Sequence, residues 1–122
     1  MGRSDPYIFD EYLKFLTSEQ VRLNESARVA FLGFQGHNDL TMAIRAKEAD
    51  FYDLALGNWD INSDWELQHR DYDMIVSTRC PYFAKDPADF YARCKSHVRL
   101  GGFIFLDWGL GDHWRFEKFK IG

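Results

Sequence analysis

Short apolar runs that alternate with helix-forming segments are the feature that most constrains how this chain can fold. Residues 28–34, 72–77 and 103–106 are such runs, and turn residues bound them, as expected of strands buried on both faces of a sheet. Helical patterns occupy residues 39–48, after the first run, and 85–99, before the last. Strands that alternate with helices are typical of parallel β-α-β units. We therefore predict an α/β protein with a mostly parallel sheet flanked by helices.

The rest of the chain fits this pattern. Ser4, a cap residue, and Pro6, suited to a first helical turn, open a predicted helical segment over 6–24. Residues 52–56 are a further strand candidate, and the polar segment 58–71 is predicted to be a loop. No repeat or linker divides the 122 residues, so we predict one domain. The domain 1–122 then consists of the helical segment 6–24, a sheet core over 28–107, and a loop and tail over 108–122.

Composition and charge exclude several classes of protein. The formal net charge is −4, whereas broad, non-specific binding of nucleic acid needs a basic surface. The apolar runs are far shorter than the roughly 20 residues of a membrane-spanning helix. Cys80 and Cys94 are too few for a disulfide framework and have no metal-ligand spacing. We therefore expect a cytoplasmic protein with no resident metal, and we expect neither nucleic acid nor membrane as a partner.

The loops that follow the predicted strands are the candidate ligand-binding segments. In open parallel sheets, ligands bind beyond the carboxyl ends of the strands. Glycines, tryptophans and polar side chains are concentrated in the loops that leave those ends, and aromatic residues make up 17% of the chain. The candidate loops are residues 33–39, 57–60, 77–83 and 107–114.

Three segments resemble the class I S-adenosylmethionine-dependent methyltransferases. Residues 28–44 resemble that family's motif I, in which a buried strand runs into a glycine-rich turn so that backbone can approach the cofactor. Residues 73–77 are similar to its fourth strand, and residues 90–107, FYARCKSHVRLGGFIFLD, are similar to its helix, Gly-Gly turn and fifth strand. The resemblance implies a Rossmann-like fold, S-adenosyl-L-methionine as the cofactor and methyl transfer as the activity.

The end of the chain departs from that family. The family's fold normally continues into two further strands that form an antiparallel hairpin at the sheet edge. Here only residues 115–121 are a candidate for such a strand. The resemblance therefore implies a reduced fold that lacks the usual final strands. Because a bare sheet edge invites pairing, we also expect a homo-oligomer through that edge.

The resemblance also implies which residues hold the cofactor, with two alignments open. If residues 52–56 form the second strand, Asp53, about 20 residues after Gly33, is the acid that holds the ribose hydroxyls. If they form the third strand, which we favour, Asp60 accepts a hydrogen bond from the adenine amino group and Trp59 stacks on the base. The predicted cofactor-binding residues are Gly33, Phe34, Gln35, Gly36, His37, Asp39, Asn58, Trp59, Asp60 and Ser77.

Residues 80–83, Cys-Pro-Tyr-Phe, resemble the N-P-P-Y/F signature of amino-group methyltransferases. The resemblance implies Tyr82 as a catalytic residue that stacks on the acceptor. In the loop after the last strand, His113 is a second catalytic candidate, because an imidazole can act as a base near neutral pH. The alternative is that Pro81 shapes the loop, the aromatic rings cover the sheet, and His113 is a solvated side chain. The predicted substrate-binding residues are Arg79, Pro81, Phe83 and Trp108.

Two functions remain open at this point. The first is methyl transfer from S-adenosylmethionine to an unidentified acceptor, which depends on positioning for in-line attack more than on acid–base groups. The second is a non-catalytic module of the same fold that binds S-adenosylmethionine or a nucleotide, or serves as a scaffold. The incomplete glycine motif argues against a dinucleotide.

Overall fold

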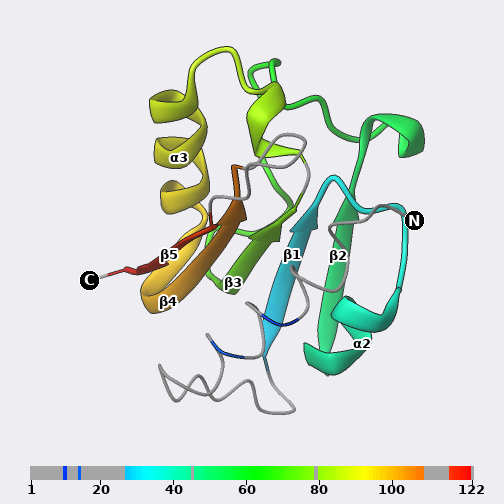
Figure 1. The fold of residues 1–122 in the computed structure, drawn as a ribbon. Coiled ribbons are helices and arrows are strands. Elements are labelled where there is room, and N and C mark those ends of the chain that lie inside the picture. Colours follow the sequence, from blue (N-terminus) through cyan, green and yellow to red (C-terminus); the bar gives the residue numbers. More distant parts are fainter. Residues whose placement is uncertain are drawn as a thin grey trace.

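The computed structural model describes Asp10, Lys14 and residues 27–44, 46–78, 80–108 and 116–121. Its centre is one five-stranded sheet (Figure 1). The strands are β1 (Arg28–Leu32), β2 (Glu48–Tyr52), β3 (Tyr72–Ser77), β4 (Val98–Asp107) and β5 (Phe116–Lys120). Between them lie the α-helices α2 (Asp39–Ile44) and α3 (Pro87–Ser96) and the short 3-10 helices η1 (Leu54–Leu56) and η2 (Pro81–Phe83).

The strands lie side by side in the order β2-β1-β3-β4-β5. β1 to β4 run parallel to one another, and β5 runs antiparallel to β4. The predicted α/β fold with a mostly parallel sheet is therefore confirmed. β5 falls within residues 115–121, the segment that the sequence offers for the sheet edge, and within the described residues it is the only strand after β4.

The strand candidate at residues 52–56 is wrong in position. The strand is β2, which ends at Tyr52, and the residues after Asp53 form η1. β2 pairs directly with β1, with Arg28 opposite Glu48 in the register. β2 therefore lies directly beside the first strand and takes the place of the family's second strand. The favoured alignment of this segment with the family's third strand is wrong.

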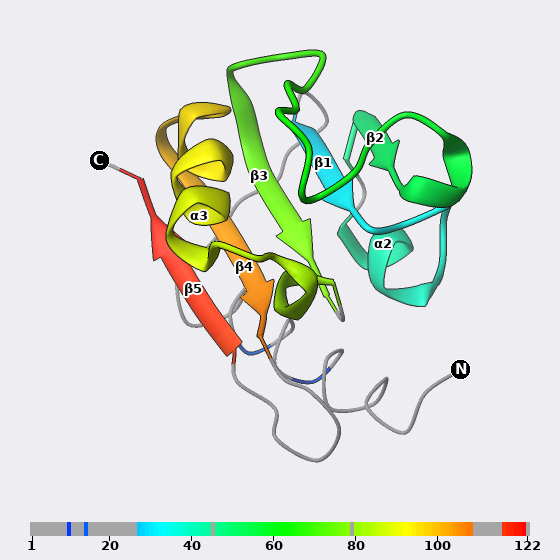
Figure 2. The ribbon, with the colours of Figure 1, turned by 90° about the horizontal axis from the view of Figure 1, so that it is seen from above.

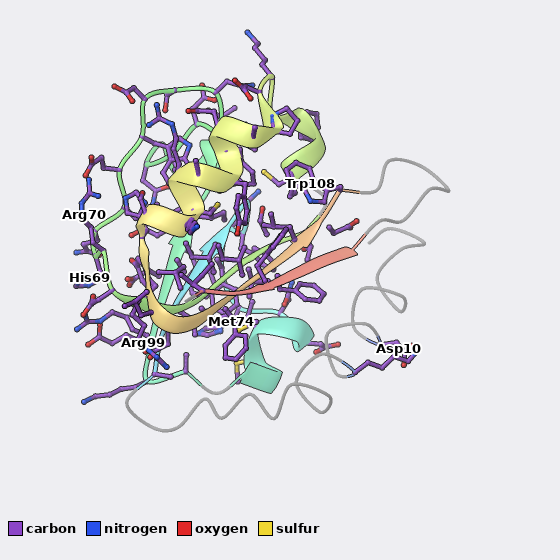
Figure 3. All side chains as sticks on the ribbon, turned by 90° about the vertical axis from the view of Figure 1, so that its left-hand side faces the viewer. Asp10, His69, Arg70, Met74, Arg99 and Trp108 are labelled. Carbon is purple, nitrogen blue, oxygen red and sulfur yellow. The ribbon has the colours of Figure 1, made fainter. Side chains whose placement is uncertain are left out.

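Helices cover both faces of the sheet. α3 packs on one face and α2 lies on the other (Figure 2, Figure 3). Beneath α3, the rings of Trp65 and Phe90 pack edge-to-face with their centroids 6.2 Å apart. In the second core cluster, Phe31 stacks on Phe51 at 5.3 Å. Large apolar side chains thus fill both faces, as a parallel sheet requires.

The predicted loop over 58–71 is a fixed part of the fold. The Trp65 ring stacks on His97 at a centroid distance of 5.5 Å. His97 Nε2 accepts a hydrogen bond from the backbone N–H of Leu67 at 3.1 Å, and Arg93 donates to the Trp65 carbonyl at 3.3 Å. These contacts fasten the loop to α3 and to the residue that follows it.

The helix predicted over 85–99 is shorter in the structure. The carboxylate of Asp86 accepts from the backbone N–H of Asp89 at 3.1 Å, and Pro87 occupies the first turn. Val98 already belongs to β4 and pairs with β3. The pairing of β4 with the sheet therefore ends α3 earlier than the apolar pattern predicts.

The N-terminal segment predicted to be helical over 6–24 is described only at two residues. Asp10 and Lys14 are both helical and form a salt bridge of 2.9 Å. The other residues of the segment lie outside the described residues. Within the described ranges, no helix has the length and apolar character needed to cross a membrane.

Ion pairs join neighbouring strands at their amino-terminal ends. The guanidinium of Arg28 lies 2.7 Å from Glu48, and this hydrogen bond raises the pKa of Arg28 and lowers the pKa of Glu48. Asp73 accepts from Arg99 at 2.5 Å. Figure 3 shows Arg99 at this end of the sheet and Trp108 at the other. These ion pairs join neighbouring strands at the amino-terminal end of the sheet.

Candidate functional site

The carboxyl ends of β1 and β3 mark the topological switch point of the sheet. The chain moves from β1 to β2 on one side and then to β3 on the other, and open α/β sheets bind ligands at such a point. A cavity of about 620 Å³ opens there, which we call the β1–β3 cavity. Its volume lies within the roughly 300–1,000 Å³ of small-molecule sites. Residues 33–38 and Thr78 line it, so five predicted cofactor-binding residues, Gly33 to His37, are brought together.

Two glycines of the turn after β1 have different roles. Gly33 has φ +85°, and its N–H donates to the Tyr52 carbonyl at 2.6 Å. A Cβ on Gly33 would lie 2.8 Å from Cys80 Cβ, so backbone conformation and packing both require glycine here. A Cβ on Gly36 would meet no atom within 4 Å. The absence of a side chain at Gly36 therefore leaves the cavity open, whereas Gly33 serves the fold.

The polar residues after the glycine turn form a fixed wall. Asn38 caps α2: its side-chain oxygen accepts from the Thr41 N–H at 3.0 Å, and Thr41 Oγ1 accepts from the Asn38 N–H at 2.8 Å. His37 Nδ1 lies 3.1 Å from Thr41 Oγ1, and its ring packs edge-to-face on Phe51 at 4.9 Å. His37 is thus held at the cavity wall, while Asp39 is exposed in the first turn of α2.

The hydroxyls of Ser77 and Thr78, at the carboxyl end of β3, have different roles. The Ser77 side chain is fully buried and donates to the Leu32 carbonyl at 2.9 Å, which ties β3 to β1. Thr78, which the sequence prediction missed, is 8% exposed and lines the β1–β3 cavity. A threonine hydroxyl at the wall of a cavity can donate a hydrogen bond to a ligand or accept one from it.

Asp53 lies at the carboxyl end of β2, where one of the two open alignments places the ribose-binding acid. The carbonyl before it, of Tyr52, accepts from Gly33, so Asp53 begins beside the glycine turn. One carboxylate oxygen accepts from the Ala55 N–H at 2.9 Å, which fixes the side chain at the start of η1. The direct pairing of β2 with β1 favours this alignment over the one that uses Asp60.

Cys80 packs over the glycine turn, between Gly33 and the end of β3. Burial raises the pKa of its thiol to about 11. A hydrogen bond with Ser77 lowers this pKa, but by less than burial raises it. The thiol is therefore neutral near pH 7. Because the thiolate is the nucleophile, this position gives Cys80 a packing role rather than a reactive one.

Cys80 in the folded protein is expected to react with iodoacetamide at pH 8 at least about tenfold more slowly than in the unfolded chain. The raised pKa, about 11, keeps the thiol protonated at pH 8, so the rate should increase as the pH rises toward that value. Mass spectrometry of the peptide that contains Cys80 measures the alkylation. Equal rates in the folded and unfolded chain would contradict this environment.

Three predicted cofactor residues, Asn58, Trp59 and Asp60, line a second cavity of about 380 Å³, which we call the Leu54 cavity after the exposed leucine that lines it. The Asn58 amide braces this loop, since it donates to the Phe51 carbonyl and accepts from the Asp53 N–H, both at 2.9 Å. None of the described residues lines both cavities. Asn58 and Asp60 therefore line a different cavity from the glycine turn.

Trp59 is predicted to stack on a base, but its ring belongs to the core. It is 7% exposed and packs edge-to-face on Trp65 at a centroid distance of 5.6 Å. The indole N–H groups of Trp59 and Trp65 are both shielded from water and have no hydrogen-bond partner in the part of the chain that the structure describes. Stacking on an adenine would require the Trp59 ring to leave this packing.

The predicted acceptor-side residues are described only in part. Pro81 is buried, and Phe83 lies at the surface, 60% exposed. Trp108 packs edge-to-face on Phe90 at 5.9 Å, with its indole N–H buried. Arg79 and His113 lie outside the described residues, and of Tyr82 only the backbone, within η2, is described.

The lining of the β1–β3 cavity suits a polar organic ligand. It offers a glycine-rich backbone, the Gln35 amide, the His37 imidazole and the Thr78 hydroxyl. Within the described ranges, no group of three or more His, Cys, Asp or Glu side chains is arranged to hold a metal ion. The donor set therefore matches a ligand recognised by hydrogen bonds and shape.

Solved structures are similar to this chain in fold, although no protein-family model and no curated protein matches it. A complex between the Haloferax volcanii Trm112 methyltransferase activator and a candidate methyltransferase matches with a TM-score of 0.55 and 15% identity, over 88% of this chain and 60% of that chain. A candidate methyltransferase from Bacillus halodurans matches with a TM-score of 0.51 and 10% identity, over 80% and 50%. The chain has a methyltransferase-like fold. It spans between half and three-fifths of the length of the chains that it matches.

Proposed function

We propose that this protein binds S-adenosylmethionine in the β1–β3 cavity and transfers its methyl group to an acceptor. The observation that carries the proposal is the cavity of about 620 Å³, lined by the glycine turn and Thr78, at the switch point of a methyltransferase-like sheet. The resemblance of the glycine turn to motif I supports the same ligand. The alternative, a non-catalytic module that binds the same ligand, differs only in whether turnover follows binding.

The chain's own residues would hold this cofactor at two of its parts, the amino-acid part and the ribose. The open backbone at Gly36 and the polar side chains of Gln35 and Thr78 would bind its amino-acid part. Asp53, fixed at the end of β2, would accept from the ribose hydroxyls. When bound, S-adenosylmethionine supplies a methyl group that the sulfonium has already activated. The protein then contributes mainly by binding and orienting the reactants, which is consistent with a neutral Cys80 beside the site.

Thr78→Val is expected to weaken the binding of S-adenosylhomocysteine about 5- to 30-fold. Valine keeps the shape of threonine but removes the hydroxyl, and one hydrogen bond to a ligand contributes about 1–2 kcal/mol. Isothermal titration calorimetry measures the affinity. Wild-type affinity in this variant would remove the main support for ligand binding at Thr78.

Ser77→Ala is the matched control. Its hydroxyl is committed to the Leu32 carbonyl, so its loss should cost about 1–2 kcal/mol of stability in urea unfolding and leave ligand affinity within about twofold of the wild type. The two variants together separate a ligand contact from a structural one on adjacent residues.

We further propose that the protein associates through a sheet edge. β2 and β5 are the outer strands of the described sheet, and outer strands present unpaired backbone groups. The Haloferax volcanii neighbour was solved with a protein activator. Light scattering that gives the mass of one chain at every concentration tested would exclude a homo-oligomer.

A further inference from the structure

We propose that His37 makes ligand binding in the β1–β3 cavity dependent on pH, because its charged imidazolium binds the carboxylate of the cofactor's amino-acid part. The inference rests on the proposed function and names the residue and the ligand group that regulate binding. His37 is exposed at the cavity wall. At Gly36, next to it in the chain, a Cβ would meet no atom within 4 Å, so the cavity is open there. A ligand can therefore reach the imidazole.

The charge of the lining depends on His37. Among the described residues that line the cavity, His37 has the one titratable side chain, and none has a carboxylate. The other lining residues are glycines, amides, a phenylalanine and a threonine. Histidine is the side chain that changes charge between about pH 5 and 8. The described lining is therefore neutral above that range and positive below it, and its positive form favours a ligand with a carboxylate.

The contacts of Thr41 determine which nitrogen of His37 meets the ligand. The buried Thr41 hydroxyl accepts from the Asn38 N–H at 2.8 Å and donates to the Asn38 carbonyl at 3.1 Å. Because its hydrogen is used in this way, it accepts from His37 Nδ1–H, which lies 3.1 Å away. Nδ1 then carries a proton in both the neutral and the charged imidazole, so the ring keeps its orientation. Nε2 is the nitrogen that gains a proton and donates it to the ligand carboxylate in a hydrogen bond.

The protein's own acidic groups leave this nitrogen to the ligand. The described titratable groups on the elements that pack against His37 are Asp39 on α2, Glu48, Asp50 and Tyr52 on β2, and Asp53 directly after β2. Those of β2 alternate with Phe51, whose ring His37 touches, so they point to the opposite face of the sheet. Asp39 is exposed, and Asp53 accepts from the Ala55 N–H. None of the five is among the described lining residues of the cavity.

The test is calorimetry of the full chain with S-adenosylhomocysteine and with its decarboxylated analogue, which keeps the amino group and lacks the carboxylate. We expect S-adenosylhomocysteine to bind at least about fivefold more tightly at pH 6 than at pH 8, and the analogue to bind no more tightly at pH 6. An affinity for S-adenosylhomocysteine that does not change with pH, or an equal change for the analogue, would overturn the inference and leave the proposed function intact. Failure of both compounds to bind would contradict the proposed function, and this inference with it.

His37→Asn tests the residue itself. The asparagine amide places an N–H where Nδ1 lies, so the bond to Thr41 is preserved while Nε2 is lost. At pH 6 we expect at least about fivefold weaker binding of S-adenosylhomocysteine, and no gain in affinity between pH 8 and pH 6. Titrations in phosphate and in Tris, whose ionisation enthalpies differ, should show proton uptake on binding in the wild type and none in this variant. Proton uptake equal to that of the wild type would contradict the role of His37.

His69→Asn is the matched control. His69 is also partly exposed, but its Nε2 lies 3.9 Å from Glu48 and 4.0 Å from Asp50, and it does not line the cavity. This variant should keep the wild-type dependence of affinity on pH. Loss of that dependence in both variants would show that it does not come from His37.

Discussion

Replacing Gly36 by valine is expected to reduce the affinity for S-adenosylhomocysteine at least about 100-fold, which corresponds to about 2.7 kcal/mol. Gly36 lines the β1–β3 cavity, and a Cβ there meets no atom within 4 Å, so the new side chain would stand in open space within the site. Its backbone is not in the left-handed region that favours glycine. Calorimetry measures the affinity, and urea unfolding should give a stability close to that of the wild type.

Gly33→Ala is the matched control for this variant. Gly33 has φ +85°, and a Cβ on it would lie 2.8 Å from Cys80 Cβ, so the substitution should destabilise the protein by about 1–3 kcal/mol even without ligand. The pair distinguishes a glycine that keeps the cavity open from a glycine that the turn requires. Wild-type affinity in Gly36→Val would mean that the ligand lies elsewhere.

Trp65→Ala is expected to lower the free energy of unfolding by about 3–5 kcal/mol, a large part of the roughly 5–15 kcal/mol typical of a domain. Trp65 is 5% exposed and touches the rings of Trp59, Phe90 and His97, which come from the loop, α3 and the end of α3. The truncation would leave a cavity where the loop meets the helix. Urea unfolding followed by circular dichroism measures the loss.

Leu54→Ala is the control for Trp65→Ala. Leu54 belongs to the same connection between β2 and β3 but is 71% exposed, so its truncation should change stability by no more than about 0.5 kcal/mol. If Trp65→Ala were equally mild, the segment 58–71 would not be a packed part of the core.

Continuous apolar patterns made part of the fold predictable from the sequence. β1 and β3 coincide with mainly apolar runs, because central parallel strands are buried on both faces. β2 is an edge strand whose Glu48 and Asp50 interrupt the pattern. Their partners, Arg28 at 2.7 Å and the Tyr72 hydroxyl at 2.6 Å, come from other strands and cannot be seen in the local sequence.

The candidate site was predictable where it depends on one turn and not where it depends on contacts between distant segments. The glycine turn after β1 is a local signal in the sequence, and in the structure it lines the β1–β3 cavity. Ser77 and Thr78 follow the same apolar run, and only the pairing of β3 with β1 directs one hydroxyl into the sheet and leaves the other beside the cavity. In the sequence, Trp59 looks like an exposed aromatic residue of a loop. Its partner Trp65 lies in the same irregular segment, so no local pattern shows that the two rings pack together.

The central claim is that the β1–β3 cavity holds S-adenosylmethionine, and calorimetry on the wild-type chain tests it most directly. The account predicts saturable binding of S-adenosylmethionine and of S-adenosylhomocysteine, and no binding of NAD. Failure of both sulfur compounds to bind a folded, wild-type chain would contradict it.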